Sequence, residues 1–424
     1  MALASEDTKK KPSLSDLDTN MRGHWYPVSF SKHLSKDKPV GLHLLGDPIV
    51  IFRDSNGTAC CVADICAHRS APLSIGRMTD GELECKYHGW RYNSEGKVTH
   101  IPALEKHKTI PKSASTKVYP CHEMDGLIWV YPQANPSHKV DPAEIPDLTP
   151  GGRENKAQWS EPFDFAVDLN IDHSLMVENL LDPAHLPFTH ENTLAKRSDA
   201  TPLHMDVSTA KNSIIGIAAF PERVLKPQTK FTFKVPCHVH IYAELKPGWE
   251  FEQSMSCVPT RPGHMRLIFR QGQTFFNYLN NIPFFQQIME RASLKIVMQD
   301  YELLHGQQTR LHQQAKSWVT PIQVDRLPFL YRSWYYSALK AKPFFEGYDS
   351  TDIEDLDKMK NNQCSSSDGC HYDENVFPNQ DGVDNSAYRM NQKGLSNAQS
   401  SLLKLMSVSA AVCIVSIVLS KWKK

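Results

Sequence analysis

Cys66-Ala67-His68 and, after sixteen intervening residues, Cys85-Lys86-Tyr87-His88 are the two stretches of sequence that decide the fold. Each stretch brings one thiol and one imidazole together in a short, hairpin-like loop. A mixed-ligand [2Fe–2S] cluster takes two cysteines on one iron and two histidines on the other. The pattern therefore predicts such a cluster, with both cysteines on the first iron and both histidines on the second.

A structural zinc ion is the alternative, because Zn²⁺ also accepts two cysteines and two histidines. Zinc frameworks usually keep like ligands together, whereas Cys66, His68, Cys85 and His88 alternate in type. The alternation favours the Rieske type of [2Fe–2S] cluster over zinc. Because imidazoles are neutral, such a cluster is less negative than an all-cysteine cluster and accepts an electron more readily. We therefore expect an electron-transfer centre.

Composition and charge narrow the function further. The chain has 424 residues, enough for two or three domains, and its 47 basic and 47 acidic side chains cancel. Without a net charge to attract it, nucleic acid is not expected as a partner. No secretory signal precedes the ten cysteines, so free thiols are expected. Cys364 and Cys370 lie close together in a polar region, where we expect ordinary loop thiols and a redox pair is the alternative.

The pattern of apolar and turn residues indicates an all-β domain followed by an α+β domain. Short β-rich runs separated by turn signals such as Asp54-Ser55-Asn56-Gly57 predict strands over about residues 24–135. Further strand-like runs then precede a long helical pattern from about residue 284 to residue 314. The predicted order is a disordered tail, a Rieske domain, a catalytic domain, a disordered polar linker and a C-terminal membrane anchor, at residues 1–23, 24–135, 136–347, 348–400 and 401–424.

The membrane anchor is predicted from an apolar run near the C-terminus. Residues 405–420 carry no charge, and three lysines follow them. A bilayer core is crossed by about 20 apolar residues, so residues 402–404 must join the span, with Lys404 reaching the interface. A buried terminal helix is the alternative. The long polar stretch before the run favours a single transmembrane helix, because a core helix is rarely tethered in that way.

A second group of candidate metal ligands lies in the run 179–190. His185 and His190 do not share a face of a straight helix, but Pro187 would kink that helix and let both rings converge. Two imidazoles and one carboxylate form the facial triad of non-haem Fe(II) oxygenases, which leaves positions free for O₂ and water. By itself such a pair is more often structural. Beside a cluster that donates electrons, it predicts a mononuclear Fe²⁺ site.

The third ligand is expected on the long helical pattern. Asp300 lies three residues after Val297 and four before Leu304, on or beside the predicted buried face. A buried carboxylate is costly unless it binds a cation or is otherwise paired. Asp300 is therefore the candidate ligand, and Glu302 is the competing carboxylate. An exposed helical acid that binds no metal is equally compatible with the pattern.

The two loops, with Gly89-Trp90 after the second, and the run Asn-x-x-Asp-x-x-His-x-x-x-x-His at 179–190 resemble those of Rieske-type non-haem iron oxygenases. Within that family the chain is most similar to the pheophorbide a oxygenase branch, which also includes chlorophyllide a oxygenase and the Rieske protein of the plastid import machinery. The resemblance extends over about residues 24–345. The runs that carry the likeness to the branch lie at 41–42, 83–90, 110–114 and 177–185.

The resemblance implies an α+β architecture in which the all-β Rieske domain precedes a helix-grip catalytic domain, often in a head-to-tail homotrimer. In such a ring Asp182 would bridge a cluster histidine of one subunit to an iron histidine of the next. Asp300 matches the position of the family's third iron ligand. The resemblance also implies a monooxygenase that uses O₂ and takes electrons from a ferredoxin or a reductase.

We therefore expect a membrane-anchored monooxygenase that oxygenates a bulky apolar substrate, such as pheophorbide a in chlorophyll catabolism. A sterol or another lipophile is the alternative substrate. A membrane-attached electron carrier or redox sensor without turnover is the alternative function, since a carrier needs the cluster alone. The resemblance implies a plastid address, although residues 1–22 show no clear transit sequence.

Overall fold

The computed structural model describes residues 12–137, 139–160, 163–219, 229–275, 285–313, 315 and 320–341. The chain forms two compact units, Met1–Glu346 and Gly347–Lys424, and every described residue lies in the first. The predicted polar linker at 348–400, with Cys364 and Cys370, and the predicted anchor at 401–424 lie outside the described residues. Among the helices of the described part, none combines the length and the apolar character that a membrane span requires.

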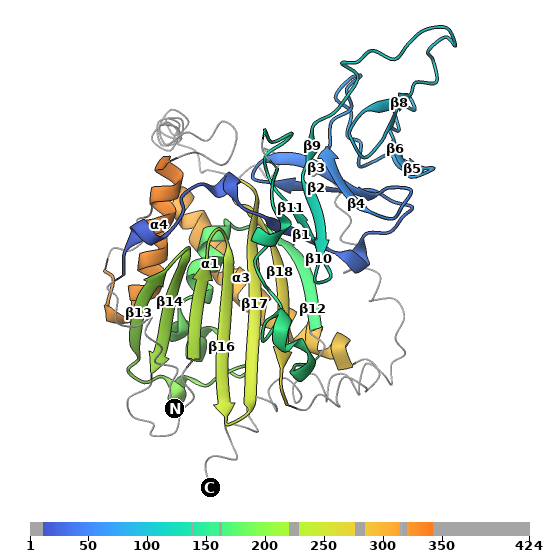
Figure 1. The fold of residues 1–424 in the computed structure, drawn as a ribbon. Helices are drawn as coiled ribbons and strands as arrows, with labels where there is room; N and C mark the ends of the chain where they lie inside the picture. Colours follow the sequence, from blue (N-terminus) through green and yellow to red (C-terminus); the bar gives the residue numbers. More distant parts are fainter. Residues whose placement is uncertain are drawn as a thin grey trace, which may run out of the picture. The chain divides into compact units, whose positions relative to one another are not determined.

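The first domain is all β, as predicted (Figure 1). Its strands form three antiparallel sheets, in the orders β1-β11-β10, β2-β3-β4-β9 and β5-β6-β7-β8. The strands are β1 Tyr26–Phe30, β2 Val40–Leu44, β3 Asp47–Arg53, β4 Ala59–Ala63, β5 Arg77–Thr79, β6 Glu82–Glu84, β7 Arg91–Tyr92, β8 Val98–His100, β9 Val118–Tyr119, β10 Cys121–Met124 and β11 Leu127–Val130, with the 3₁₀ turn η4 Ser31–His33. The cysteine–histidine loops therefore lie where the chain joins β4 to β5 and β6 to β7.

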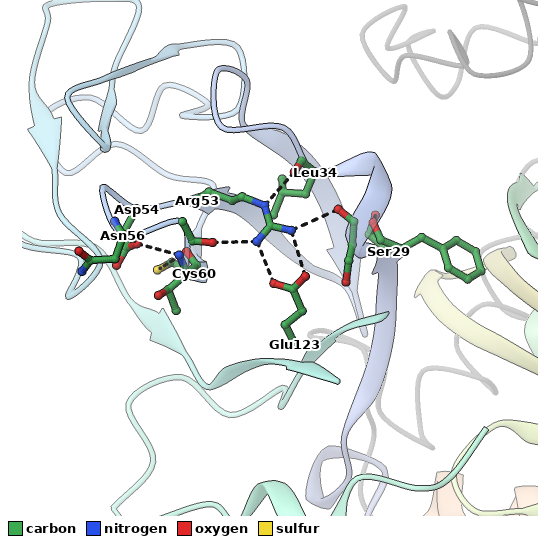
Figure 2. Close-up of polar contacts among 11 residues, drawn as sticks. Ser29, Leu34, Arg53, Asp54, Asn56, Cys60 and Glu123 are labelled. Atoms are coloured by element: carbon green, nitrogen blue, oxygen red, sulfur yellow. Dashed lines mark hydrogen bonds and ion pairs between the residues drawn. The ribbon is translucent and has the colours of Figure 1, made fainter. Parts of the chain in front are cut away.

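Arg53, the last residue of β3, ties several segments of this domain together (Figure 2). Its guanidinium donates to both carboxylate oxygens of Glu123 on β10, at 2.8 and 3.1 Å. It also donates to the backbone oxygens of Leu34 and Gly57, at 2.9 and 2.8 Å. The Arg53 side chain is only 14% exposed, so water screens these charge-assisted bonds incompletely. They hold the end of β3 against β10 and the neighbouring turn.

One hydrophobic core supports both cysteine–histidine loops. Cys66 and Cys85 are themselves members of it, so each loop is anchored by its own candidate ligand. Burying an aliphatic or aromatic side chain of this kind stabilises a fold by roughly 1.5–3 kcal/mol. The other fully packed members come from strands and loops throughout the domain: Val50, Phe52, Val62, Leu73, Leu83, Tyr92, Val98 and Ala114.

The second domain is α+β, as predicted. Its seven-stranded antiparallel sheet has the order β12-β18-β17-β16-β15-β14-β13. The strands are β12 Phe163–Leu169, β13 His204–Ala210, β14 Ser213–Ala219, β15 Thr229–Lys234, β16 His238–Lys246, β17 Trp249–Arg261 and β18 His264–Gln273. The helices are α1 His173–Leu180, α2 Leu186–Thr189, α3 Phe285–His312 and α4 Arg326–Ala341, with 3₁₀ turns η5 Pro142–Glu144, η6 Arg153–Gln158, η7 Pro183–His185, η8 Arg197–Asp199 and η10 Gln323–Asp325.

Helices α1, α3 and α4 lie against one face of this sheet (Figure 1). On that face Phe233 of β15 packs against the rings of Tyr331 and Trp334 of α4, with ring centroids 4.8 and 4.9 Å apart. The helix expected from about 284 to 314 is α3, which confirms the apolar stripe read from the sequence. The long helix and the sheet together give the helix-grip arrangement, and α3 carries the candidate ligand Asp300.

The prediction of a disordered tail over residues 1–23 is wrong for the described part of that segment. Residues 14–16 and 21–23 form the 3₁₀ turns η2 Leu14–Asp16 and η3 Met21–Gly23, and the side chains of Leu17 and Met21 are buried. The backbone oxygen of Asp18 accepts a hydrogen bond from the indole of Trp334, at 2.9 Å. The polar composition concealed this packing, because two apolar side chains suffice to fix a short segment on a preformed surface.

Candidate metal centres

The two cysteine–histidine loops have the same backbone hydrogen bonds. The amide of Cys66 donates to the carbonyl of Ala71, and the amide of Cys85 donates to the carbonyl of Trp90, each at 2.9 Å. Both bonds join a cysteine to the residue five positions later. The two loops are therefore matched clips that present their ligands in the same way, as the sequence predicted from their composition.

The fifth position of each clip turns the chain back on itself. Ser70 and Gly89 have φ angles of +54° and +71°, and their amides donate to the carbonyls of Cys66 and Cys85, at 2.8 and 3.0 Å. A side chain at Gly89 would be strained by this conformation and would meet Pro102 at 2.9 Å. Glycine at this position therefore allows the second clip to close without strain.

The four candidate cluster ligands divide into a buried pair and an exposed pair. Cys66 and Cys85 are 3% and 1% exposed, whereas His68 and His88 lie at the surface. The two imidazole rings are 4.6 Å apart, and His68 stacks on Trp90 with ring centroids 4.7 Å apart. Electrons would therefore enter and leave through the histidine side, while the sulfurs remain in the core.

The sulfurs of the two cysteines lie against each other. Burial raises the pKa of the Cys85 thiol, and the neighbouring Cys66 sulfur raises it further. Two buried thiolates in contact are unfavourable unless a cation separates them. The pair therefore fits a shared iron, which is the arrangement that a Rieske cluster requires on its cysteine side.

Tyr92 completes the surroundings of the Cys66 sulfur, although no feature of the sequence marks it. The backbone amide of Ala67 donates to the Tyr92 hydroxyl at 2.9 Å, and that hydroxyl lies 3.1 Å from Cys66 Sγ. Because the hydroxyl accepts from Ala67, its own proton is free to point at the sulfur. Burial raises the pKa of Tyr92, which keeps the phenol protonated. Hydrogen bonds to the sulfurs are one of the factors that set the reduction potential of such a cluster.

A single zinc ion is the alternative occupant of the two cysteine–histidine loops. Zinc bonds of about 2.0–2.3 Å in a tetrahedron place all four ligand atoms close together. Within the described residues, the one group with three metal-binding atoms mutually within 4.8 Å is His185, His190 and Asp300. The cysteine–histidine set is not among such groups, and its alternating ligand types favour a cluster of two irons.

The histidine pair of the second centre is brought together by a break in the chain after α1. That helix ends at Leu180, and Asp182 caps the next turn by accepting a hydrogen bond from the amide of Ala184, at 2.8 Å. The kink was predicted at Pro187, but it occurs at Asp182-Pro183, because Pro183 starts η7 and Pro187 lies within the first turn of α2. The predicted convergence nevertheless follows, with the two imidazole rings 5.3 Å apart.

Asp300 reaches the two histidines from α3. Its Oδ1 lies 3.5 Å from His185 Nε2 and 3.2 Å from His190 Nε2. The Asp300 side chain is buried, and no lysine or arginine of the described residues pairs with it. Glu302, the competing candidate, is exposed. A buried carboxylate that faces two imidazoles and no fixed cation is a donor set suited to Fe²⁺.

The electrostatics of the two histidines differ. Burial lowers the pKa of His185 even though Asp300 lies nearby. Burial acts on His190 in the same direction, but the hydrogen bond that its ring donates to the Asp300 carboxylate helps to raise the pKa of His190 above its ordinary value. The carboxylate therefore interacts more strongly with His190, in agreement with the shorter of the two distances.

Further contacts hold the triad in place, and none of them could be inferred from the sequence. Asn179 at the end of α1 donates from Nδ2 to Asp300 Oδ1, at 3.3 Å. Its neighbour Glu178 forms a buried ion pair with Arg332 of α4, which also donates to the hydroxyl of Ser174, at 3.2 Å. This pair fixes α1 against α4 and, through Asn179, fixes the position of the carboxylate.

Asp182 lies beside the triad, where the resemblance placed a bridge between subunits. Its Oδ2 is 4.0 Å from His185 Nδ1, and its side chain is 30% exposed. Nδ1 of His185 is buried and makes no hydrogen bond of normal geometry within the described residues. The bridging role of Asp182 stays a prediction, because it requires a second subunit.

Known proteins resemble this chain in both sequence and fold. The family model "Rieske [2Fe-2S] domain" matches residues 24–120, and the model "Pheophorbide a oxygenase" matches residues 233–318. Chlorophyllide a oxygenase of Chlamydomonas reinhardtii is 32% identical, over 76% of this chain and 49% of the relative. Pheophorbide a oxygenase of Oryza sativa subsp. japonica is 27% identical, over 85% of this chain and 75% of the relative.

The chain thus spans about half the length of the chlorophyllide a oxygenase that it matches. Among solved structures, dicamba monooxygenase bound to 3,6-dichlorosalicylic acid superposes with a TM-score of 0.64 at 20% identity, covering 76% of this chain and 98% of the other. At that identity the likeness establishes the fold alone. Together with the two family models and the matched clips, it shows that the chain belongs to the Rieske-type non-haem iron oxygenases, in the branch of pheophorbide a oxygenase.

Proposed function

We propose that this protein is a Rieske oxygenase that uses O₂ and external electrons to oxygenate a bulky apolar substrate, most simply a chlorophyll-derived tetrapyrrole such as pheophorbide a. The observation that carries the proposal is the convergence of His185, His190 and Asp300 in a chain that also holds the matched cluster clips. An electron carrier needs a cluster but no second site. A buried carboxylate that no lysine or arginine of the described residues faces is costly to keep without a metal cation, so the triad favours an enzyme.

We assign the cluster to Cys66, His68, Cys85 and His88, within a Rieske domain at residues 24–135. The mononuclear Fe²⁺ is assigned to the triad, within a catalytic domain at 136–347. When bound, the iron supplies open coordination positions for O₂, and the cluster supplies electrons. The chain's own contribution is to hold three ligands on one side of that position, with Asn179 and Asp182 arranged behind them.

The choice of substrate rests on the relatives. Two of them are named for chlorophyllide a and pheophorbide a, which are both large, largely apolar tetrapyrroles. A sterol or another lipophile remains the alternative. The electron donor is proposed to be a ferredoxin or a reductase, and the exposed side of the cluster at His68 and His88 is the surface at which it would exchange electrons.

We further propose that the chain assembles as a head-to-tail homotrimer. The exposed cluster histidines of one subunit would then meet Asp182 of the next, whose carboxylate can hydrogen-bond two imidazoles at once. The proximity of Asp182 to His185 Nδ1 and its partial exposure support this assignment. Sedimentation at micromolar concentration tests it, and a monomer at all concentrations would contradict it.

A plastid address is proposed from the names of both relatives, which describe them as chloroplastic. A single-pass anchor at 401–424 is proposed from the apolar run alone. Deleting residues 402–424 should move the protein from membranes to the soluble fraction. If the truncated protein stays with membranes, the anchor assignment fails.

The function is tested by comparing Asp300→Ala with Glu302→Ala, two acids on the same helix of which one is buried beside the histidines and one is exposed. Wild type should hold about three irons per chain, two in the cluster and one in the triad. Asp300→Ala should lose about one of them and all product formation, whereas Glu302→Ala should match wild type. Products are identified by mass spectrometry with labelled O₂ and a panel of tetrapyrroles and sterols. Two irons per chain in wild type, without product from any substrate, would favour the carrier.

A further inference from the structure

We propose that Gln299 is a positioning residue that holds the ring proton of His190 on Nδ1 and so leaves Nε2 able to bind the mononuclear iron. The proposal rests on the iron site assigned above and extends it to a residue that binds neither metal nor substrate. It is carried by the hydrogen bonds of one imidazole, whose two nitrogens face two successive residues of α3.

The His190 ring lies between Gln299 and Asp300. Its Nδ1 is 3.1 Å from Gln299 Oε1, and its Nε2 is 3.2 Å from Asp300 Oδ1. The His190 side chain is 1% exposed, so bulk water cannot replace either contact. Both nitrogens are therefore controlled by the protein, and each one is controlled by a different residue.

The identity of the atom that Gln299 presents decides the chemistry of the ring. A neutral imidazole carries one proton, and the nitrogen without it is the one that binds a metal. An acceptor oxygen opposite Nδ1 keeps the proton there and leaves the lone pair of Nε2 directed at the iron. The amide nitrogen of the same side chain would instead donate to Nδ1 and place the proton on Nε2, which would block coordination. Gln299 therefore serves the iron only with its oxygen toward the ring.

Thr193 supports that orientation. Its hydroxyl lies 3.0 Å from Gln299 Oε1 and 2.9 Å from the carbonyl of His190. Because a hydroxyl has a single proton, these two acceptors share it. The contact to Gln299 is thus weaker than a full hydrogen bond, and the effect of Thr193 is secondary to that of Gln299.

The two histidines of the triad are held differently. His190 has a complete set of partners within one subunit, whereas Nδ1 of His185 has no hydrogen bond of normal geometry among the described residues, and the Asp182 carboxylate is 4.0 Å away. Residues that hydrogen-bond the far nitrogen of a metal-binding histidine fix its tautomer and typically contribute 10- to 100-fold to metal affinity. Gln299 is the residue that hydrogen-bonds the far nitrogen, Nδ1, of His190.

The test measures metal affinity in four proteins: wild type, Gln299→Leu, Gln299→Glu and Gln287→Leu. Gln287 is an exposed glutamine on the same helix and is the matched control. Co²⁺ is the probe, titrated anaerobically against a chelator into full-length protein with its cluster loaded, and its visible spectrum reports the coordination. The absorbance of the Rieske cluster in the same sample shows that the chain has folded.

Gln299→Leu should raise the dissociation constant for Co²⁺ by about 10- to 100-fold. Gln299→Glu keeps an acceptor oxygen and should bind as tightly as wild type or more tightly, and Gln287→Leu should bind as wild type does. Equal binding by Gln299→Leu and wild type would overturn the proposal. Weak binding by Gln299→Glu would also overturn it, since packing rather than an acceptor would then matter. If wild type itself binds no Co²⁺, the iron site fails, and the role of Gln299 fails with it.

Discussion

The two candidate metal centres differ in how far apart their ligands lie in the sequence. The Rieske ligands lie within residues 66–88 and are presented by two clips with the same backbone hydrogen bonds. At the triad, His185 and His190 are close in sequence, but Asp300 comes from α3. Strands β13 to β18 lie between the histidines and α3 along the chain. Local turns build the first centre, whereas the second exists only after a helix has packed onto a sheet.

The two centres also differ in what they expose. The cluster keeps its sulfurs in the core and presents both imidazoles at the surface, as electron exchange with a partner requires. The triad buries His190 and Asp300 and leaves Asp182 partly exposed beside His185. The described residues thus leave the imidazoles of the first centre accessible and keep two of the three candidate ligands of the second away from water.

The largest expected effect concerns the link between the centres. Asp182→Asn keeps the oxygen that caps η7 but removes the charge, so both metal centres should load normally while coupled turnover falls by about 100-fold or more. Stopped-flow oxidation of the reduced cluster measures the transfer step directly. Asp206→Asn, an exposed acid on β13, is the control. Normal turnover in Asp182→Asn would exclude the bridge and leave the two centres connected by another route.

The buried ion pair behind the triad should have the next largest effect. Arg332→Leu breaks the buried ion pair with Glu178, and removing one member of such a pair typically costs 3–5 kcal/mol of unfolding free energy. Iron affinity at the triad should fall as α1 loosens, while the absorbance of the cluster stays unchanged. The double variant with Glu178→Leu removes both charges and should recover most of the stability. A melting temperature of Arg332→Leu equal to that of wild type would show that the pair does not support the site.

The smallest effect is expected from the scaffold of the Rieske domain. Arg53→Ala should lower the unfolding free energy by about 1–3 kcal/mol through lost hydrogen bonds, and the spectrum of the assembled cluster should not change, because the clips are held by their own backbone. Arg197→Ala, which breaks an exposed pair with Glu191, is the control and should change stability very little. An altered cluster spectrum in Arg53→Ala would contradict the local origin of the clips.

The stability lost in Arg53→Ala should depend on pH. The hydrogen bond from Arg53 lowers the pKa of Glu123 below its ordinary value of about 4.3. When the pKa of a carboxyl is lower in the folded state than in the unfolded state, the group stabilises the fold fully at a pH above its unfolded-state pKa. This stabilisation is lost as the pH falls through its folded-state pKa. Chemical denaturation should therefore show the difference between wild type and variant narrowing below about pH 4. A difference that stays constant there would mean that the pair contributes through packing alone.

Several features of the triad could be predicted from the sequence, and others could not. The histidines on either side of Pro187 predicted a converging pair, and the apolar stripe made Asp300 the candidate carboxylate, although an exposed acid was equally compatible with that pattern. The position of the kink was wrong, because a proline in the first turn of a helix is compatible with that helix and the preceding Asp-Pro step is not. Asn179 and Gln299 could not have been identified, since an amide side chain in a sequence carries no sign of what it faces.

The sequence by itself determined the cluster clips, because their ligands, their turns and the glycine at position 89 are all local and each has a fixed backbone requirement. It also determined the class of each domain, through the periodicity of apolar residues. Only the tertiary structure decided that Asp300 rather than Glu302 meets the histidines, that residues 13–23 pack onto the catalytic domain, and that Gln299 faces His190. The physical reason is that these contacts join segments that are distant along the chain. Whether such segments meet depends on how the helices pack against the sheet and not on any short run of residues.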